Sequence, residues 1–360
     1  MKNKSHSFAV ILCGGHGKRV WPMSTLKNPK YAVRIHQDET ILDFTIKRLL
    51  GIFRNNNIFL ITNVNTKDLV FNISRKYNIP YRNIITESIT RNTLAAFSLA
   101  TSIIQSKHGD CNLFFFPADH YFENNKEFIK IINQLEVHVN HNRYATIGIK
   151  PNFPSTDYGY LIPKESTKGN FFTIRKFIEK PRASIAQKLI KSHVFWNAGI
   201  YAFKSNFFEH LVKTYQPLYH MLFENIKNHE DIYKTLPQLS IDKGISELLP
   251  EIYLVPYKQN WLDLGDWNQL KIFYEVFFKR KMKNLMISVD GKEIISESNN
   301  SLVIVSNHDR VFVKDFNQKQ AFHESTPSSL SFSFEEESDY RPWGFYKTLF
   351  LSDHVRVKSL

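Results

Sequence analysis

The run Leu113-Phe114-Phe115-Phe116 places the tightest limit on how this chain can fold. An uninterrupted run of large apolar residues suits a β-strand that is buried on both faces, because a strand with one face in water alternates apolar and polar side chains. Strands of this kind occur mainly in sheets that helices cover on each side. The run therefore predicts a central strand, over Asn112–Pro117, in a helix-covered α/β sheet.

The rest of the first half alternates β-type runs with helical patterns, as such a sheet requires. Further strands are predicted at Ala9–Cys13, Ile58–Thr62 and Ala145–Ile149. Apolar residues recur at three- and four-residue spacing in the predicted helices Ile41–Phe53, Lys67–Tyr77, Thr93–Gln105 and Phe128–Val139. This order is typical of a mixed, mostly parallel sheet with helices on both faces.

The second half predicts more of the same domain, followed by a small β-rich region. Its predicted strands are Ile174–Glu179, Phe195–Phe203 and Ile252–Pro256, and its predicted helices are Ser184–Lys191, Asn206–Thr214, Ile241–Leu248 and Asp266–Lys283. Short β-like runs then follow at Leu285–Val289, Leu302–Val305 and Arg310–Val313, separated by turn signals. We predict a main domain over residues 1–283, a β-rich appendage over 284–325, and a linker with a further remnant over 326–360.

Charge and cysteine content narrow the class of protein. The net charge is +13, yet Lys and Arg are scattered, and the one cluster, Lys279-Arg280-Lys281 with Lys283, suits the solvated end of a helix better than a nucleic-acid contact. Two cysteines, Cys13 and Cys111, are too few for a disulfide framework. No run is apolar and long enough for a membrane span. We therefore expect a cytoplasmic protein that binds neither nucleic acid nor membrane.

The first predicted strand leads directly into Gly14-Gly15-His16-Gly17-Lys18-Arg19. The backbone amides of such a turn can close on phosphate oxygens, because no Cβ blocks the approach. The spacing fits neither the dinucleotide fingerprint nor the P-loop. By itself the segment leaves two interpretations open, a phosphate site and a plain tight turn.

The continuation of this segment resembles the signature of bacterial mannose-1-phosphate guanylyltransferases. The resemblance begins with Gly14-Gly15-His16-Gly17-Lys18-Arg19-Val20-Trp21-Pro22-Met23-Ser24 and Asn28-Pro29-Lys30-Tyr31. It continues in order, to about residue 280, through Glu87 with Arg91-Asn92-Thr93, Pro117-Ala118-Asp119-His120, Tyr158-Gly159-Tyr160, Phe177-Ile178-Glu179-Lys180-Pro181, Trp196-Asn197-Ala198-Gly199, Ser240-Ile241-Asp242 and Trp261-Leu262-Asp263-Leu264-Gly265-Asp266-Trp267.

The resemblance implies a fold, a reaction and a set of site residues. The fold is a Rossmann-like, GT-A-like nucleotidyltransferase domain, and the reaction joins GTP and α-D-mannose 1-phosphate into GDP-mannose and pyrophosphate. The sugar phosphate is already an anion, so the chemistry requires charge neutralisation and no general base. Arg19 and Lys30 take the catalytic roles at the phosphates, while Asp119 and Asp263 hold Mg²⁺.

Binding roles follow from the same resemblance. The nucleotide is assigned to the glycine turn, with Gly14, Gly15, Gly17 and Lys18, and to a base-reading set of Glu87, Arg91, Asn92 and Thr93. The sugar phosphate is assigned to Gly159, Glu179, Lys180 and Asn197. Without the family, capping of a helix by Asn92 or Thr93 and a surface ion pair of Glu179 with Lys180 would be sufficient explanations.

Several departures and alternatives remain open. Cys13, Lys18, Asp157 and Asp266 differ from the usual family residues, but none of these changes removes a charged group with an assigned role. The segment Tyr340-Arg341-Pro342-Trp343-Gly344-Phe345-Tyr346 resembles the start of a cupin-type phosphomannose isomerase domain, and the residues after it are too few for a barrel. We therefore expect no isomerase activity. We expect the appendage to serve either in packing or as a homodimer contact. Alternative functions are the same chemistry with another hexose or heptose 1-phosphate or another nucleoside triphosphate, and a non-catalytic sugar-nucleotide-binding regulator.

Overall fold

The structure is a computed structural model that describes residues 6–15, 20, 24–25, 27–36, 38–164 and 171–281, together with the backbone of six short strands beyond residue 284. Contacts divide the chain into two compact units. The first unit contains residues 1–16 and 26–261, and the second contains residues 17–25 and 262–360. The three domain limits expected from the sequence remain predictions.

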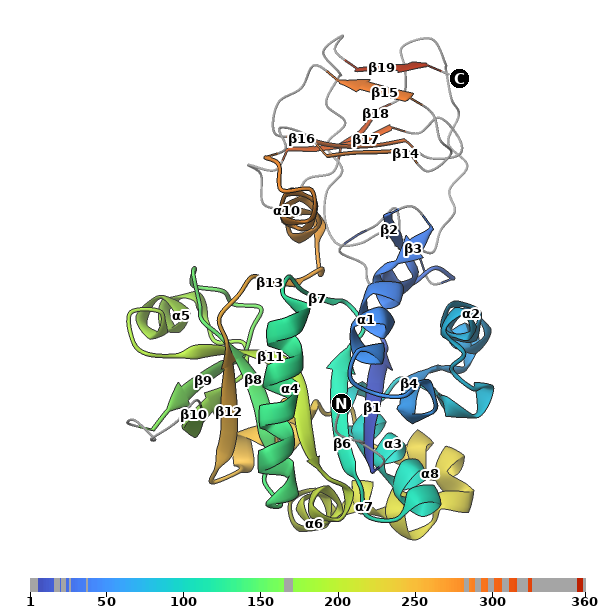
Figure 1. Cartoon of the computed structure of the whole chain (residues 1–360), viewed down its shortest axis with the longest axis vertical. Coiled ribbons are helices and arrows are strands. Elements are labelled where there is room, and N and C mark those ends of the chain that lie inside the picture. Colours follow the sequence, from blue (N-terminus) through green and yellow to red (C-terminus); the bar gives the residue numbers. More distant parts are fainter. Residues whose placement is uncertain are drawn as a thin grey trace. The chain divides into compact units, whose positions relative to one another are not determined.

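A nine-stranded mixed sheet forms the centre of the first unit (Figure 1). Its strand order is β5-β4-β1-β6-β11-β8-β12-β10-β9. In chain order the strands are β1 (Ser7–Cys13), β4 (Ile58–Asn63), β5 (Ile84–Glu87), β6 (Asn112–Pro117), β8 (Ala145–Ile149), β9 (Tyr160–Pro163), β10 (Phe172–Ile178), β11 (Phe195–Lys204) and β12 (Ile252–Tyr257). The central strand lies where the sequence predicts it, whereas β5 and β9 were not expected.

Parallel pairing joins β5, β4, β1 and β6, and it also joins β8 to β12. Strand β11 runs antiparallel between β6 and β8, and β10 runs antiparallel to β9 and β12. The carboxyl ends of β1, β4, β5 and β6 therefore meet at one edge of the sheet. The expected mixed α/β fold is confirmed, with its parallel character concentrated in the first half.

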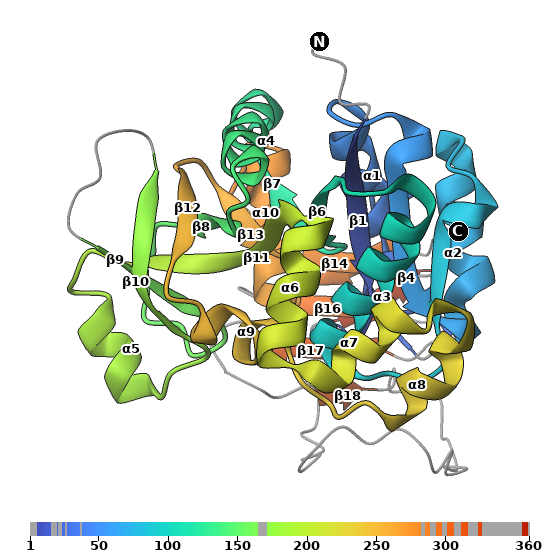
Figure 2. The ribbon, with the colours of Figure 1, turned by 90° about the horizontal axis from the view of Figure 1, so that it is seen from below.

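Different helices cover the two faces of the sheet (Figure 2). One face packs against α1 (Ile41–Leu50), α2 (Lys67–Ser74) and α4 (Asn125–Asn140). The other packs against α3 (Asn92–His108), α6 (Ser205–Tyr215), α7 (Pro217–Glu224), α8 (His229–Thr235) and α9 (Ile241–Gly244). A short helix, α5 (Ala183–Leu189), follows β10.

Strand β6 shows why both faces must be covered. Phe114 and Phe116 belong to the core on one face, and Leu113 and Phe115 belong to the core on the other. None of these side chains is more than 2% exposed. Because successive side chains of a strand point to opposite faces, the apolar run fills both cores.

Several predicted helices end earlier than expected, and the difference is largest for two of them. The segment predicted as one helix over Ile241–Leu248 is α9 followed by a 3-10 turn at Ser246–Leu248, because Ile245 leaves the helical region at φ −130° and ψ −59°. In the second unit, α10 spans Trp267–Phe277 and stops before the basic cluster. Lys279 has a φ of 52°, a left-handed conformation that a helix cannot continue.

The β-rich part of the second unit is described by its backbone alone. A four-stranded sheet has the order β14 (Leu285–Ser288), β16 (Ser301–Val305), β17 (Val311–Asp315) and β18 (His323–Ser325). In a separate pair, β15 (Glu293–Ser296) runs antiparallel to β19 (Val355–Lys358). Thus the segment predicted as a linker and remnant supplies a strand that pairs with the appendage.

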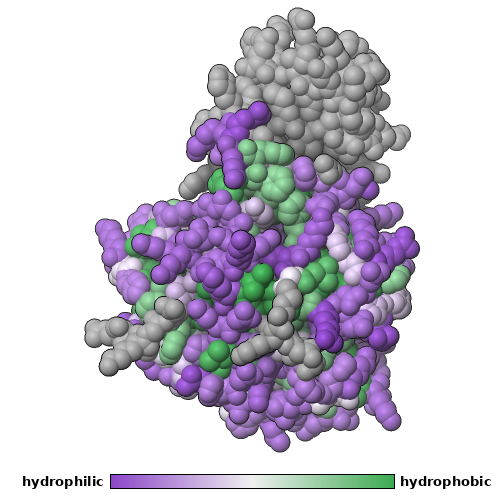
Figure 3. Space-filling view, viewed as in Figure 1, coloured by the Kyte–Doolittle hydropathy of each residue, from purple (hydrophilic) through white to green (hydrophobic). Residues whose placement is uncertain are grey.

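The surface of the first unit agrees with the scattered charges of the sequence. On the face drawn in Figure 3, hydrophilic residues cover most of this unit and apolar ones form small separate patches. No helix among the described residues is both long enough and apolar enough to cross a membrane.

The packing of β6 gives a stability prediction. The Phe115 ring stacks on Phe97 with centroids 3.9 Å apart, and both rings are fully buried. Phe115→Ala should lower the free energy of unfolding by about 3–5 kcal/mol, because it leaves a cavity between β6 and α3. Denaturant unfolding followed by circular dichroism measures this. The control Leu218→Ala removes a side chain that is 59% exposed and should change stability by less than about 0.5 kcal/mol. Equal effects would contradict the assigned packing.

Candidate active site

The glycine turn begins where β1 ends, at the carboxyl edge of the parallel strands. Gly15 has a φ of 88°, which favours glycine, and no described atom lies within 4 Å of the position that a Cβ would occupy on Gly14 or Gly15. No described residue would therefore obstruct a ligand at these two positions. Gly17, Lys18 and Arg19 lie outside the described residues, so their assigned roles remain predictions.

Lys30 and Asp119 form an ion pair at the same edge. Lys30 begins a 3-10 turn, Lys30–Ala32, after Pro29, and Asp119 lies between β6 and the short strand β7 (His120–Phe122). Their side chains are 12% and 23% exposed. Burial by itself would raise the pKa of Asp119, but the charge of Lys30 and then that of His120 lower this pKa to about 2. The structure thus brings one predicted phosphate contact next to one predicted metal ligand.

The carboxylate of Asp119 is a suitable ligand for a divalent cation. Its carboxylate is ionised at neutral pH, partly exposed, and has the imidazole of His120 3.9 Å away. Asp119, His120 and Asp263 are the candidate metal-ligating side chains among the described residues. Asp263 ends β13 (Trp261–Asp263) and belongs to the second unit. Binding of one ion by Asp119 and Asp263 together therefore remains a prediction.

The first part of the predicted base-reading set is tied to α8. Glu87 ends β5, is 5% exposed and accepts a hydrogen bond from the hydroxyl of Tyr233. Burial raises the pKa of Glu87, and the bond from Tyr233 opposes that rise. The guanidinium of Arg91 donates to the carbonyl of Lys234. Glu87 thus joins the end of β5 to α8, and Arg91 joins the start of α3 to α8.

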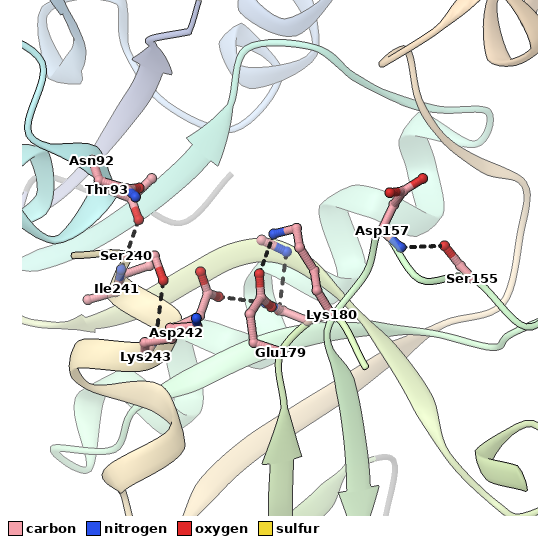
Figure 4. A network of polar contacts seen from close by, with 12 residues as sticks. Asn92, Thr93, Ser155, Asp157, Glu179, Lys180, Ser240, Ile241, Asp242 and Lys243 are labelled. Atoms are coloured by element: carbon pink, nitrogen blue, oxygen red, sulfur yellow. Dashed lines mark hydrogen bonds and ion pairs between the residues drawn. The ribbon is translucent and has the colours of Figure 1, made fainter. Parts of the chain in front are cut away.

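The second part of that set does not cap α3, contrary to the capping interpretation of the sequence. Asn92 has a φ of 68°, and its side-chain oxygen accepts from the backbone N–H of Thr93 at 2.8 Å. The Thr93 hydroxyl oxygen accepts from the backbone N–H of Ile241 at 2.8 Å, at the start of α9 (Figure 4). The N-cap residue of α3 is Arg91, whose guanidinium has no acceptor atom, so its side chain cannot cap the helix.

The four residues predicted to bind the sugar phosphate lie together. The backbone N–H of Asn197 donates to the carbonyl of Gly159 at 2.8 Å, and Lys180 pairs with Glu179. A Cβ on Gly159 would lie 2.7 Å from a carboxylate oxygen of Glu179 and 2.9 Å from the Phe177 ring, so any other residue here would force these side chains to shift. The Glu179 side chain is 7% exposed and that of Lys180 is 61% exposed. The Glu179 carboxylate is therefore buried, so the pair differs from a surface ion pair in which both side chains are exposed.

Asp242 completes this group, although the sequence assigned it no role. Its carboxylate accepts from the Asn197 amide at 3.2 Å and from the Tyr201 hydroxyl. The same amide donates to the Tyr201 oxygen at 2.6 Å, and its carbonyl oxygen accepts from Thr146 and from the backbone N–H of Gly199, each at 3.1 Å. The only sequence signal was the family motif Ser240-Ile241-Asp242.

The charges of this group favour hydroxyl binding. Burial and then the neighbouring carboxylate of Asp242 raise the pKa of Glu179, while Lys180 opposes the rise. Burial likewise raises the pKa of Asp242. Figure 4 shows both carboxylates beside Lys180. Paired carboxylates accept hydrogen bonds from hydroxyls, and the ammonium group attracts a phosphate.

An aromatic group adjoins these residues in the first unit. The Tyr158 ring lies 5.0 Å from that of Trp196 and 5.2 Å from that of Trp261, measured between centroids. The indole N–H groups of both tryptophans are buried and have no partner within the described part of the chain. Because buried donors are nearly always bonded, a ligand oxygen would suit them.

Comparison with known proteins identifies the class that this fold and site define. The nucleotidyl transferase family matches residues 8–277, and the chain belongs to that family. Over 98% of its length it is 27% identical to the mannose-1-phosphate guanylyltransferase of Salmonella muenchen, and it covers 80% of that protein. Over 99% of its length it is 26% identical to the mannose-1-phosphate guanylyltransferase of Escherichia coli K12, of which it covers 81%. These matches confirm the resemblance found in the sequence.

Solved structures confirm the fold. A crystal structure from Thermus thermophilus, named a mannose-1-phosphate geranyltransferase, superposes with a TM-score of 0.76 at 22% identity, covering 86% of this chain and 95% of that one. A mannose-6-phosphate isomerase from Helicobacter pylori superposes with a TM-score of 0.58 at 18% identity, covering 71% and 99%.

The Lys30–Asp119 pair gives a pH prediction. Because the pKa of Asp119 is about 2 in the folded protein and 3.8 ordinarily, its contribution to stability is present above pH 4 and is lost as the pH falls toward 2. The free energy of unfolding of Asp119→Asn should therefore fall less over that range than that of the wild type. Denaturant titrations at several pH values measure this. Asp38→Asn, which removes a 94% exposed carboxylate, is the control and should keep the wild-type slope. Identical slopes for all three proteins would refute the pairing.

Proposed function

We propose that this chain transfers a guanylyl group from GTP to α-D-mannose 1-phosphate, forming GDP-mannose and pyrophosphate. The observation that carries the proposal is the Lys30–Asp119 pair beside the open Gly14-Gly15 turn, at the edge where parallel strands end. The names of the curated relatives support the choice of base and sugar.

The proposed reaction exchanges one phosphorus–oxygen bond for another. A phosphate oxygen of the sugar attacks the α-phosphorus of GTP in line, and pyrophosphate leaves on the opposite side. Both reactants are anions, so the barrier falls when fixed positive charge lies at the α-phosphate and the leaving group. Lys30 is a cation held in place by Asp119, and Arg19 is the second cation that we assign to the phosphates.

Magnesium fits the carboxylate chemistry of this edge. We assign it to Asp119 and Asp263, because Mg²⁺ is bound through one or two carboxylates together with phosphate oxygens. When bound, it supplies further neutralisation of phosphate charge. Asp119 also orients Lys30, so this carboxylate serves the reaction by two routes.

The nucleotide and the sugar phosphate take neighbouring parts of the site in this proposal. The glycine turn receives the phosphates of GTP, and the segment from Glu87 to Thr93 reads guanine. The hexose hydroxyls bond to Glu179 and Asp242, and Lys180 binds the sugar phosphate. Asn197 has its amide bonded within the protein, so we assign it the positioning of Gly159 and Asp242.

Two alternative functions would use the same site. A different hexose or heptose 1-phosphate or a different nucleoside triphosphate would use the same charged groups, and a regulatory homologue would bind the sugar nucleotide without turnover. The cytoplasmic location and a homodimer remain predictions.

The deciding experiment is a substrate panel. The four common nucleoside triphosphates are combined with several sugar 1-phosphates, with and without Mg²⁺, and pyrophosphate release is measured. We expect GTP with mannose 1-phosphate and Mg²⁺ to give the highest kcat/KM, and Asp119→Ala and Asp263→Ala to be inactive. Preference for another pair would redirect the proposal to that substrate, and product binding without any turnover would favour the regulator.

Lys30→Ala separates catalysis from binding. Its charge matters most when the α-phosphate carries five oxygen contacts, so kcat should fall about 100-fold while KM for GTP changes less than about threefold. Steady-state pyrophosphate release measures both constants. Lys27→Ala is the control, since it removes a nearby lysine that has no assigned role. A rise in KM with an unchanged kcat would contradict the catalytic role of Lys30.

A further inference from the structure

Helix α1 places a buried arginine behind the turn that carries Asp119. Arg48 is 8% exposed, and its guanidinium donates from one nitrogen to the carbonyl oxygen of His120 at 2.8 Å and to the hydroxyl of Thr45 at 3.0 Å. The Thr45 hydroxyl in turn donates to the carbonyl oxygen of Ala118 at 3.0 Å. The two carbonyls held in this way belong to the residues immediately before and after Asp119.

A cation at this depth requires specific compensation. Burial lowers the pKa of Arg48 to about 10, so it remains charged at neutral pH. Its guanidinium carbon lies 5.0 Å from the ring centroid of Phe122 and 5.2 Å from that of Phe128, and these rings stabilise the charge. Removing a guanidinium from water is costly unless hydrogen bonds and such contacts replace the lost solvation. An apolar residue could fill this position without that desolvation cost. The hydrogen bonds are therefore the contribution that only a polar side chain such as arginine can make here.

The effect of Arg48 on Asp119 is geometric. The charges that lower the pKa of Asp119 are those of Lys30 and His120. Arg48 instead bonds directly to the backbone carbonyl of His120 and, through the Thr45 hydroxyl, indirectly to that of Ala118. The direct bond is charge-assisted and therefore stronger than a neutral one. Since the bonds flank Asp119 on both sides, they limit how its backbone can rotate, and with it the direction of the carboxylate.

We propose that Arg48, through Thr45 and the carbonyls of Ala118 and His120, is the positioning residue that orients the Asp119 carboxylate toward a divalent cation. The metal role of Asp119 rests on the proposed function. Arg48 acts through the backbone and does not touch substrate, so it is a positioning residue and not a catalytic one.

The test measures Mn²⁺ binding to the free protein by electron paramagnetic resonance, with no nucleotide present. Arg48→Met keeps an apolar side chain beside the two phenylalanine rings but removes both hydrogen bonds. It should weaken Mn²⁺ binding by about tenfold or more, the range found when partners behind a metal ligand are removed. Arg48→Lys keeps the charge but replaces the rigid, planar guanidinium with a compact ammonium group on a flexible stem, so it should give an intermediate loss.

A matched control separates this effect from general stability. Arg143 also stacks on a ring, with its guanidinium carbon 4.3 Å from the Tyr253 centroid, but it lies beside β8 and β12 away from the Asp119 turn. Arg143→Met should leave Mn²⁺ binding unchanged. A lower melting temperature in Arg48→Met with wild-type Mn²⁺ affinity would overturn the proposal, because it would leave Arg48 with a purely structural role.

Thr45→Val keeps the test decisive if Arg48→Met does not fold. It removes the bond to Ala118 and the bond that the Thr45 hydroxyl accepts from Arg48, but it keeps the bond from Arg48 to His120. It should weaken Mn²⁺ binding about two- to tenfold. An unchanged affinity in this variant would overturn the proposal, and so would a wild-type protein that binds no Mn²⁺. The substrate panel is independent of these measurements. If the wild type releases no pyrophosphate while Arg48→Met still loses Mn²⁺ affinity, the proposed function fails and the role of Arg48 stands.

Discussion

Burial of strand β6 on both faces is the constraint on which the rest of the first unit depends. Its alternating side chains belong to two separate cores, so neither face can be left open to water. Helices α1, α2 and α4 cover one side, and α3 and α6 to α9 cover the other. Because β6 is an interior strand that pairs with both β1 and β11, its carboxyl end is a rigid place from which to project a charged side chain. Asp119 occupies that place, two residues after the strand ends.

Polar residues near the sheet edge are held by bonds between elements distant in sequence. Asn197 on β11 contacts Thr146 on β8 and Asp242 on α9, and each of these groups is largely buried. Burying such groups destabilises the fold unless every donor and acceptor is matched, so the network permits one arrangement of the three elements. The same arrangement sets Glu179 against Gly159, where a side chain on residue 159 would clash. Stability and the shape of the predicted sugar site therefore depend on the same contacts.

The candidate site balances opposite charges at short range. Asp119 lies next to Lys30, and Glu179 lies next to Lys180, so each carboxylate is accompanied by an ammonium group. The two pairs differ in effect: Lys30 holds the pKa of Asp119 below its usual value, whereas burial and Asp242 keep the pKa of Glu179 above it. A low pKa suits a carboxylate that binds a cation at neutral pH, and a buried carboxylate suits hydrogen bonds from neutral hydroxyls.

The sequence by itself determined the central strands, most helices and the order of the motifs, because apolar periodicity and glycine turns act over a few residues. It also identified Lys30, Asp119, Glu179 and Asn197 as candidates through the family resemblance. Only the tertiary structure decided that Asp242 joins Asn197, that Thr93 meets Ile241 and that Arg48 lies behind Asp119. The residues that each of these contacts joins are separated by between 45 and 148 positions in the sequence. No local sequence pattern can therefore specify them. From the sequence alone, an arginine near the end of a helix, such as Arg48, is expected to be a solvated cation. Only the packing shows which carbonyl groups it contacts.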